Sequence, residues 1–256
     1  MFRRLAIGLV LALLVALPAT AQDYAKGWAA YGRGDYATAL KEWQPLAEQG
    51  NAQAQYILGA MYAKGQGVPQ DYGEALKWYH KAAAQGHANA QSNLGLMYSK
   101  GQGVPQDFAA AVKWYRKAVK QGYAPALYHL GVMYEKGQGV RQDYVEAAKW
   151  YGKAAAQGDA DAYNNYAWLL ATNKDPKFRD GEKAVALALK AVLPKRKSHY
   201  LDTLAAAYAE AGKFDEAIRV QKEAVDMLRI SGSKPQLVKN FQERLNFYKS
   251  RKPYRD

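Results

Sequence analysis

The sequence contains no cysteine among its 256 residues. This absence excludes disulfide bonds, thiolate metal sites, a cysteine nucleophile and the lipid-modified cysteine of a bacterial lipoprotein. Histidine is also rare, and no two histidines have the i, i+4 spacing of a helical zinc site. The four are His80, His87, His129 and His199. We therefore expect them on the solvated surface, and we predict no metal site and no cofactor.

The chain has only one pronounced hydrophobic run, and it is too short to be a typical membrane span. Arg3 and Arg4 precede apolar residues at 5–17, which are followed by small residues at 19–21. This layout is typical of a cleavable secretory signal peptide, because a membrane-spanning helix needs roughly 20 apolar residues. We predict a signal peptide at 1–21, a mature chain without a transmembrane segment, and a location in the periplasm or, after secretion, outside the cell.

Acidic residues are outnumbered by basic ones, 23 to 36, which gives a net charge of +13. The positive excess is spread along the chain, so no part of it is a dedicated basic domain. An exported protein of this kind is not expected to bind nucleic acid. Weak attraction to the anionic surfaces of the cell envelope fits the charge better.

The strongest feature present is an internal repeat. Three gapless blocks of 36 residues begin at positions 51, 87 and 123. They read "NAQAQYILGAMYAKGQGVPQDYGEALKWYHKAAAQG", "HANAQSNLGLMYSKGQGVPQDFAAAVKWYRKAVKQG" and "YAPALYHLGVMYEKGQGVRQDYVEAAKWYGKAAAQG". A fixed period of this length indicates a repeat architecture in which each unit packs against its neighbours.

Each block is predicted to form two helices joined by the glycine-rich stretch "KGQGVPQD" or "KGQGVRQD". The aspartate that ends this stretch, such as Asp71, is suited to cap the second helix. The stretch lies between two helices and lacks the Lys-Ser/Thr ending of a phosphate-binding loop, so it is interpreted as a corner. Gly59, Gly95 and Gly131 fall inside the first helices, where glycine costs about 1 kcal/mol relative to alanine. Close approach of the partner helix would explain them.

The pattern A-x-A-x-x-x-L-G-x-x-Y-x-x-G-x-G-V-x-x-D-x-x-x-A-x-x-W-Y-x-x-A-x-x-Q-G at 51–158 resembles Sel1-like repeats, a branch of the tetratricopeptide repeat superfamily. Residues 22–50 resemble a divergent N-terminal repeat, and 159–234 resemble looser tetratricopeptide-type repeats. Residues 235–256 are predicted to be a capping helix followed by a basic tail. The resemblance implies an all-α fold: an α-solenoid, the right-handed superhelix of antiparallel helix pairs, closed by a C-terminal capping helix.

The resemblance also implies a scaffold, with a protein or peptide partner in a groove lined by the first helices, and no catalytic residues. Carried over to this sequence, the groove positions are Gln53, Tyr56, Lys64, Asn89, Ser92, Lys100, Tyr128, Val132, Lys136, Asp161, Asn164 and Trp168. The three lysines recur in register and would form a row of positive charge. They would equally offset the helix dipole at the end of each first helix, and the sequence leaves both interpretations open.

Two other functions remain as alternatives. Aromatic pairs recur in every full block, at 78–79, 114–115 and 150–151, and a ladder of this kind could bind envelope glycan, although packing within the solenoid explains the spacing better. The stretch "SGSK" at 231–234 fits the S-x-x-K pattern of serine enzymes that act on β-lactams. Because the companion motifs "SDN" and "KTG" are missing, a β-lactam-binding hydrolase is only a remote alternative.

Overall fold

The computed structural model describes residues 19–256, and the side chains from residue 23 onward. Most of the predicted signal peptide, residues 1–18, therefore lies outside the described residues. Across the described range the chain is helical, with no strand, and it divides into two units that are described separately.

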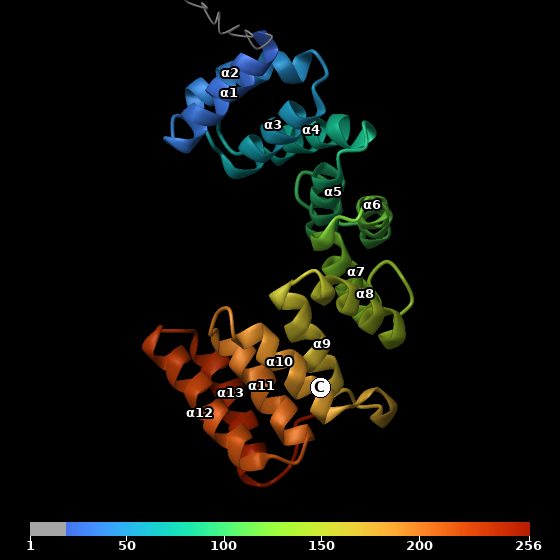
Figure 1. The fold of residues 1–256 in the computed structure, drawn as a ribbon, viewed down its shortest axis with the longest axis vertical. Coiled ribbons are helices and arrows are strands. Elements are labelled where there is room, and N and C mark those ends of the chain that lie inside the picture. The colour runs from blue at the N-terminus through green and yellow to red at the C-terminus, as the bar shows by residue number, and fades with distance from the viewer. Residues whose placement is uncertain (1–18) are drawn as a thin grey trace, which may run out of the picture. The chain divides into compact units, whose positions relative to one another are not determined.

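The first unit ends at Gln85 and contains two helix pairs (Figure 1). Its helices are α1 (Ala19–Gly32), α2 (Tyr36–Glu48), α3 (Ala52–Lys64) and α4 (Tyr72–Ala84). Each helix packs against the next along the chain, and Trp43 of α2 is fully buried in the core of this unit.

The second unit runs from Gly86 to Asp256. Its helices are α5 (Ala88–Lys100), α6 (Phe108–Lys120), α7 (Ala124–Lys136), α8 (Tyr144–Ala156), α9 (Ala160–Thr172), α10 (Gly181–Val192), α11 (Ser198–Glu210), α12 (Phe214–Ile230) and α13 (Pro235–Lys249), with a short 3-10 helix at Pro176–Phe178. Successive helices pack together, α9 also packs on α11, and α13 packs on α12.

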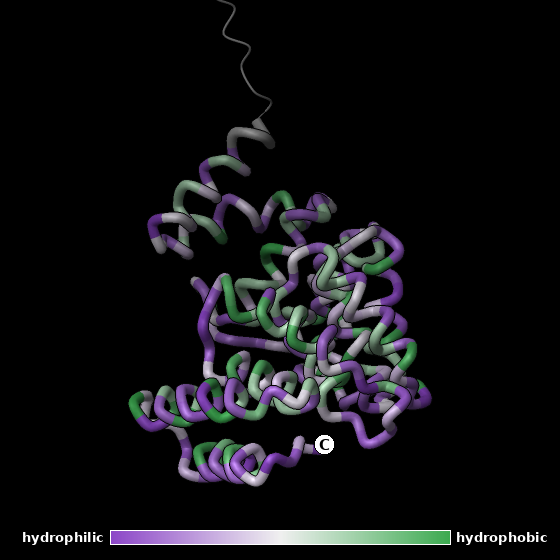
Figure 2. The backbone as a smooth tube through the Cα atoms, turned by 60° about the horizontal axis from the view of Figure 1, so that its bottom comes forward, coloured by the Kyte–Doolittle hydropathy of each residue, from purple (hydrophilic) through white to green (hydrophobic). Residues whose placement is uncertain are grey.

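The predicted fold class is confirmed. Helix pairs follow one another with the expected boundaries, and the described residues form an all-helical solenoid-type fold. Hydrophobic and hydrophilic residues alternate along the helices (Figure 2), as expected where each helix buries only one side. Among the described residues, no helix is both long and apolar enough to cross a membrane.

The repeated corner is built from backbone caps and one glutamine side chain. Its first glycine, for example Gly65, ends the first helix in the left-handed conformation at φ 67°. Two residues before the next helix, the amides of Gln70, Gln106 and Gln142 each donate to a carbonyl near the end of the preceding helix, at 2.8 Å. The corner therefore satisfies helix ends, and its repeated letters have a structural explanation.

The glycine inside each first helix makes room for a tyrosine from the second helix. A Cβ added to Gly59, Gly95 or Gly131 would lie about 2.5–2.6 Å from the ring of Tyr79, Tyr115 or Tyr151, respectively. All three rings are buried. The predicted close approach of the two helices is thus a glycine–tyrosine contact, repeated in each block.

Glutamine side chains fasten the two helices of the first two full blocks. The Gln85 amide donates to Gln55 at 2.9 Å, and the Gln121 amide donates to Gln91 at 2.7 Å. Gln55 and Gln91 are buried, so these bonds satisfy polar groups that water barely reaches. The third block has Leu127 at the corresponding position and buries it in the core instead.

Candidate functional site

The residues predicted to line the groove lie on the first helices α3, α5, α7 and α9. Lys64, Lys100, Lys136 and Asp161 are exposed. Ser92 and Asn164 are 5% and 9% exposed, so little of either side chain reaches the surface. The remaining six are half-buried: Gln53, Tyr56, Asn89, Tyr128, Val132 and Trp168.

In the first unit, Tyr56 and Lys64 line one small pocket of about 120 Å³ between α1 and α3. Trp28 and Tyr31 of α1 complete its wall. Trp28 is 45% exposed and packs edge-on against Trp43, with ring centroids 5.1 Å apart. The divergent N-terminal repeat thus contributes an accessible aromatic residue beside two predicted groove residues.

In the second unit, Tyr128 belongs to a hydrogen-bonded cluster on α7, α8 and α9. The Asn165 amide donates to the Tyr128 hydroxyl at 3.3 Å, and the Tyr151 hydroxyl donates to the Glu135 carboxylate at 2.5 Å. Burial raises the pKa of Glu135, and the nearby charge of Asp256 raises it further. Burial also raises the pKa of Tyr151, so its hydroxyl keeps its proton and acts as a donor.

A pocket of about 390 Å³ brings together Lys136 and Trp168, two of the predicted groove residues. Glu135 of α7, Thr172 of α9 and Asp256 also line it. The pocket therefore combines basic, acidic and aromatic groups from two successive first helices with the last residue of the sequence.

The last residues of the sequence lie on the same side of the second unit, against α9 and α11. The Trp168 indole donates to the Asp256 carboxylate at 2.9 Å, and the Asp256 backbone N–H donates to the carbonyl of Thr172 at 2.9 Å. Arg255 donates to the carbonyl of Ala171 at 3.2 Å and pairs with Glu210 of α11 at 2.6 Å. Figure 1 places this end of the chain beside α9. We call residues 254–256 the docked tail.

Arg244 of α13 holds the aromatic part of this site in place. Its guanidinium donates to Asp202 of α11 at 2.8 Å, in a largely buried ion pair. The same guanidinium lies 5.6 Å from the Trp168 ring centroid and 5.4 Å from that of Tyr254. The Trp168 and Tyr254 rings are themselves 6.0 Å apart. Arg244 thus lies against both rings while a buried carboxylate fixes its position.

Asp161, another predicted groove residue, is engaged by α11. It accepts a hydrogen bond from the Tyr200 hydroxyl at 2.6 Å, and Lys197 lies 3.9 Å away. Its side chain is still 55% exposed. The carboxylate can therefore accept a further donor from solvent or from a ligand.

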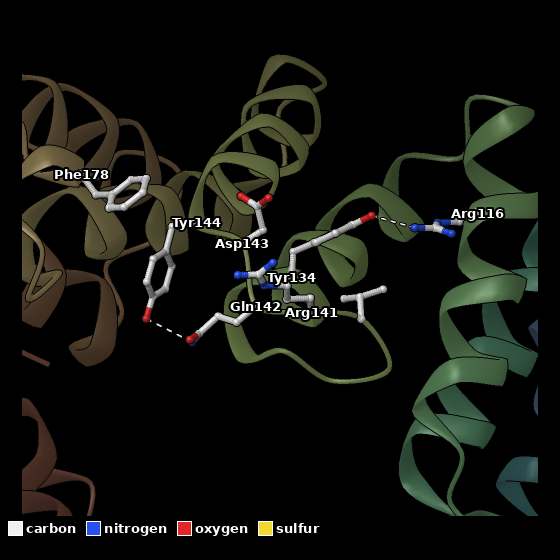
Figure 3. A pocket seen from close by; sticks show the side chains of 8 residues that line it. Arg116, Tyr134, Arg141, Gln142, Asp143, Tyr144 and Phe178 are labelled. Atoms are coloured by element: carbon white, nitrogen blue, oxygen red, sulfur yellow. Dashed lines mark hydrogen bonds between the residues drawn. The ribbon is translucent and has the colours of Figure 1, made fainter.

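A second, larger pocket of about 660 Å³ lies beside the third corner (Figure 3). Arg141, which replaces the proline of the other two corners, lines it together with Tyr134, Phe178 and Arg116. The Arg116 guanidinium already donates to the Tyr134 hydroxyl at 2.7 Å. None of the predicted groove residues lines this pocket, so the docked-tail region is the stronger candidate site.

The glycan alternative loses support from the position of the tryptophans. Lysine Nζ atoms lie over the rings of Trp78, Trp114 and Trp150 at 4.1, 4.0 and 4.5 Å from the centroids. The lysines come from the same helices as the tryptophans, at Lys81, Lys117 and Lys153. A sugar that stacked on the covered face of one of these tryptophans would first have to displace the lysine.

The hydrolase alternative also lacks a suitable arrangement. Ser231 is the C-cap of α12, and its hydroxyl donates to the carbonyl of Leu228 at 3.0 Å. Lys234 is the N-cap of α13, so the two residues flank a turn between helices. The S-x-x-K signature requires its serine on a helix within a mixed fold, a context that this turn does not provide.

The expectation for the histidines is wrong for His129. Its ring is half-buried and stacks on Tyr115, with centroids 4.9 Å apart. His87 instead caps α5, with Nδ1 accepting from the backbone N–H of Ala90 at 3.3 Å. Within the described residues, no cluster of three or more His, Asp or Glu side chains could hold a metal ion.

Sequence reasoning missed Trp28, Arg244, Tyr254 and Asp256 as parts of the site. It treated the last residues as a basic tail, because their charge is more obvious than their aromatic ring and carboxylate. The letters "KPYRD" do contain a signal: an aromatic residue and an acidic residue two positions later, next to a repeat array. Nothing in the letters reveals that they contact α9, which lies more than 80 residues earlier.

Comparisons with known proteins find similar solved structures. A solved Sel1 repeat protein from Oxalobacter formigenes is 34% identical, with a TM-score of 0.66 over 78% of this chain and 83% of that one. The Escherichia coli protective antigen c5321, with an SLR fold, is 23% identical, with a TM-score of 0.45 over 88% and 68%. A Klebsiella pneumoniae sel1 repeat protein is 20% identical, with a TM-score of 0.49 over 81% and 98%. No curated protein matches.

The family model described as "Sel1 repeat" matches four consecutive segments, 52–87, 88–123, 124–159 and 160–193. Together they cover more than half of the sequence. The first three coincide, one residue out of phase, with the blocks defined above. The fourth covers α9 and α10, where the glycine-rich corner is missing. Because the family model matches more than half of the sequence, and the helix pairs and glycine–tyrosine contacts repeat with it, the chain belongs to the Sel1 repeat family.

Proposed function

We propose that the chain is an exported scaffold that binds a segment of a partner protein on the face formed by the first helices of its second unit. Sel1 and tetratricopeptide repeat proteins are commonly protein-interaction scaffolds. One observation carries the proposal: on this face of the second unit, α9 and α11 already hold a non-helical stretch of polypeptide, the docked tail, through backbone and side-chain bonds.

Export is proposed from the sequence. The charged, apolar and small-residue parts of 1–21 favour a cleaved signal peptide. Intact-mass measurement on protein from a periplasmic fraction tests this, with Gln22 expected as the first residue. Membrane-bound protein that retains Met1 would overturn it.

The partner is expected to make its main contacts with aromatic side chains. Tyr128 and Trp168 are half-buried and anchored by hydrogen bonds, so they offer a large contact area that is already ordered. The exposed Lys136 beside them is expected to affect the association rate and its salt dependence more than the final affinity.

Site-specific cross-linking tests which face binds. A photo-reactive amino acid is placed at Val132 on α7 or, as a matched control, at Val145 on α8, which is 63% exposed. Cross-linked partner is expected from position 132 and not from position 145. Equal labelling at both positions, or labelling at 145 alone, would refute binding on the first helices.

Binding measurements with the captured partner then test the anchors. Tyr128→Ala is expected to weaken binding by roughly 2 kcal/mol or more, the level of an interface hot spot. Reversing the charge of Lys100 and Lys136, both exposed in the second unit, should flatten the salt dependence. If both variants bind as wild type while Trp114→Ala abolishes binding in a folded protein, the second helices form the binding face.

A further inference from the structure

The docked tail is held by a specific set of contacts. Asp256 makes two hydrogen bonds to α9: its backbone N–H donates to the carbonyl of Thr172, and its carboxylate accepts from the Trp168 indole. Arg255 is likewise fixed by a carbonyl of α9 and by Glu210 of α11. Successive residues of the tail therefore bond to two different first helices, as a bound peptide would.

The aromatic residue of the tail lies among preorganised groups. The Tyr254 ring lies 6.0 Å from the Phe247 ring, and it has the same separation from Trp168. Arg244, held by its buried pair with Asp202, lies close to the Tyr254 ring. These neighbours belong to the folded body of the second unit, so the place for an aromatic ring exists whichever segment fills it.

The tail does not fill the site. The pocket of about 390 Å³ next to Asp256 extends to Lys136, Tyr144 and Lys174. Asp256 is itself exposed, and its charge acts unfavourably on the half-buried Glu135 carboxylate. Exposed charged contacts contribute little each, so a segment that also reached the two lysines would compete with the tail.

We propose that the docked tail is an internal ligand that a partner must displace. The partner is a protein segment with the same chemistry, an aromatic residue followed two positions later by a carboxylate, and it continues towards Lys136 and Lys174. This inference rests on the proposed function, because it specifies the partner chemistry at one end of the proposed face. While the tail is docked, only the released fraction of the protein is competent to bind.

The probe for this test is a fluorescent peptide with the sequence of residues 249–256 and both ends blocked. It is titrated into the full chain, into a tail-released variant, Tyr254→Ala with Asp256→Ala, and into the control Lys252→Ala. Lys252 is exposed and lies two residues before the docked tail. The tail-released variant is expected to bind the peptide at least about tenfold more tightly than wild type or the control, because the competing tail is gone.

Two further measurements identify the site. Adding Trp168→Ala to the tail-released variant should abolish peptide binding, whereas adding Trp114→Ala should not. A peptide in which the tyrosine and aspartate are replaced by alanine should fail to bind. Equal peptide affinity for wild type and the tail-released variant, or binding that survives loss of Trp168 in a folded protein, would overturn the inference.

Hydrogen exchange provides a readout that does not depend on substitutions. The Asp256 amide, bonded to Thr172, should exchange slowly in the wild-type chain and quickly once excess peptide is added. An amide that exchanges freely in the absence of peptide would show that the tail is not docked, which overturns the inference.

Failure of this inference differs from failure of the proposed function. If a partner cross-links to position 132 but binds wild type and the tail-released variant equally, the face is correct and the competing tail is not. If the peptide competes as expected but no partner cross-links from the first helices, the tail site exists and the scaffold function fails.

Discussion

Substituting the buried glycine of α7 tests the packing rule of the repeat. Gly131→Ala should gain up to about 1 kcal/mol from helix propensity, because alanine is the better helix former. The added Cβ would, however, lie 2.5 Å from two ring carbons of Tyr151, which is fully buried. Overpacking of a core typically costs about 1–3 kcal/mol. Because the Tyr151 hydroxyl is bonded to Glu135, the ring has little room to shift, and the upper part of that range applies.

The expected net loss for Gly131→Ala is therefore about 1–2 kcal/mol. The matched control is Gly152→Ala in α8, where the nearest atom to an added Cβ is a ring carbon of Tyr166 at an ordinary 3.7 Å. This variant should gain up to about 1 kcal/mol from propensity alone.

Thermal melts followed by circular dichroism separate the two outcomes. In a chain of this size, each kcal/mol shifts the melting temperature by about 2–4 °C. Gly131→Ala should therefore melt several degrees below wild type, and Gly152→Ala at or slightly above it. If the two variants melt together, the glycine is not required by the tyrosine contact and the packing argument is wrong.

Three other predictions concern polar contacts in the second unit. Gln121→Ala should cost about 1–3 kcal/mol, because the Oε1 atom of the buried Gln91 loses this hydrogen-bond donor. Gln157→Ala, whose block has Leu127 at the partner position, should cost less, and urea denaturation compares the two variants. Arg244→Ala should cost about 3–5 kcal/mol in the same assay, because Asp202 stays buried without its cation. Burial raises the pKa of Glu135 above its ordinary value, so the protonated carboxyl stabilises the fold at acid pH and this contribution is lost as pH rises through the folded-state pKa. Glu135→Gln should remove that part of the pH dependence of the melting temperature.

The helix pairs could be predicted from the sequence because their causes are local. The glycine and tyrosine that are in contact at Gly131 and Tyr151 have equivalents at the same spacing in every full block. The capping aspartates and corner glycines lie within a few residues of the helix ends that they satisfy. Repetition adds to this, since a position kept in three blocks of one chain reveals what the packing demands.

The candidate site was less predictable because it depends on the exact rotation of each helix and on contacts distant in sequence. Asn164 falls at a groove position by its place in the repeat, yet it is nearly buried, while its neighbour Asn165 bonds to Tyr128. The contact between Trp168 and Asp256 spans 88 residues, and no periodicity encodes it. His129 was misjudged for the same reason, because its ring packs on a tyrosine of the preceding repeat.

The residues that vary between blocks suggest where specificity lies. One position of the first helix reads Ala60, Leu96, Val132 and Trp168 in successive repeats, so the side chain that could contact a partner is largest in the last. Glu135, beside the docked tail, stands where the two earlier blocks have Ala63 and Ser99. In the three full blocks the packing positions meanwhile keep the same glycine and tyrosine. Substitutions that change partner choice without unfolding the protein should therefore concentrate near the ends of α7 and α9, where the chain departs most from its own repeat.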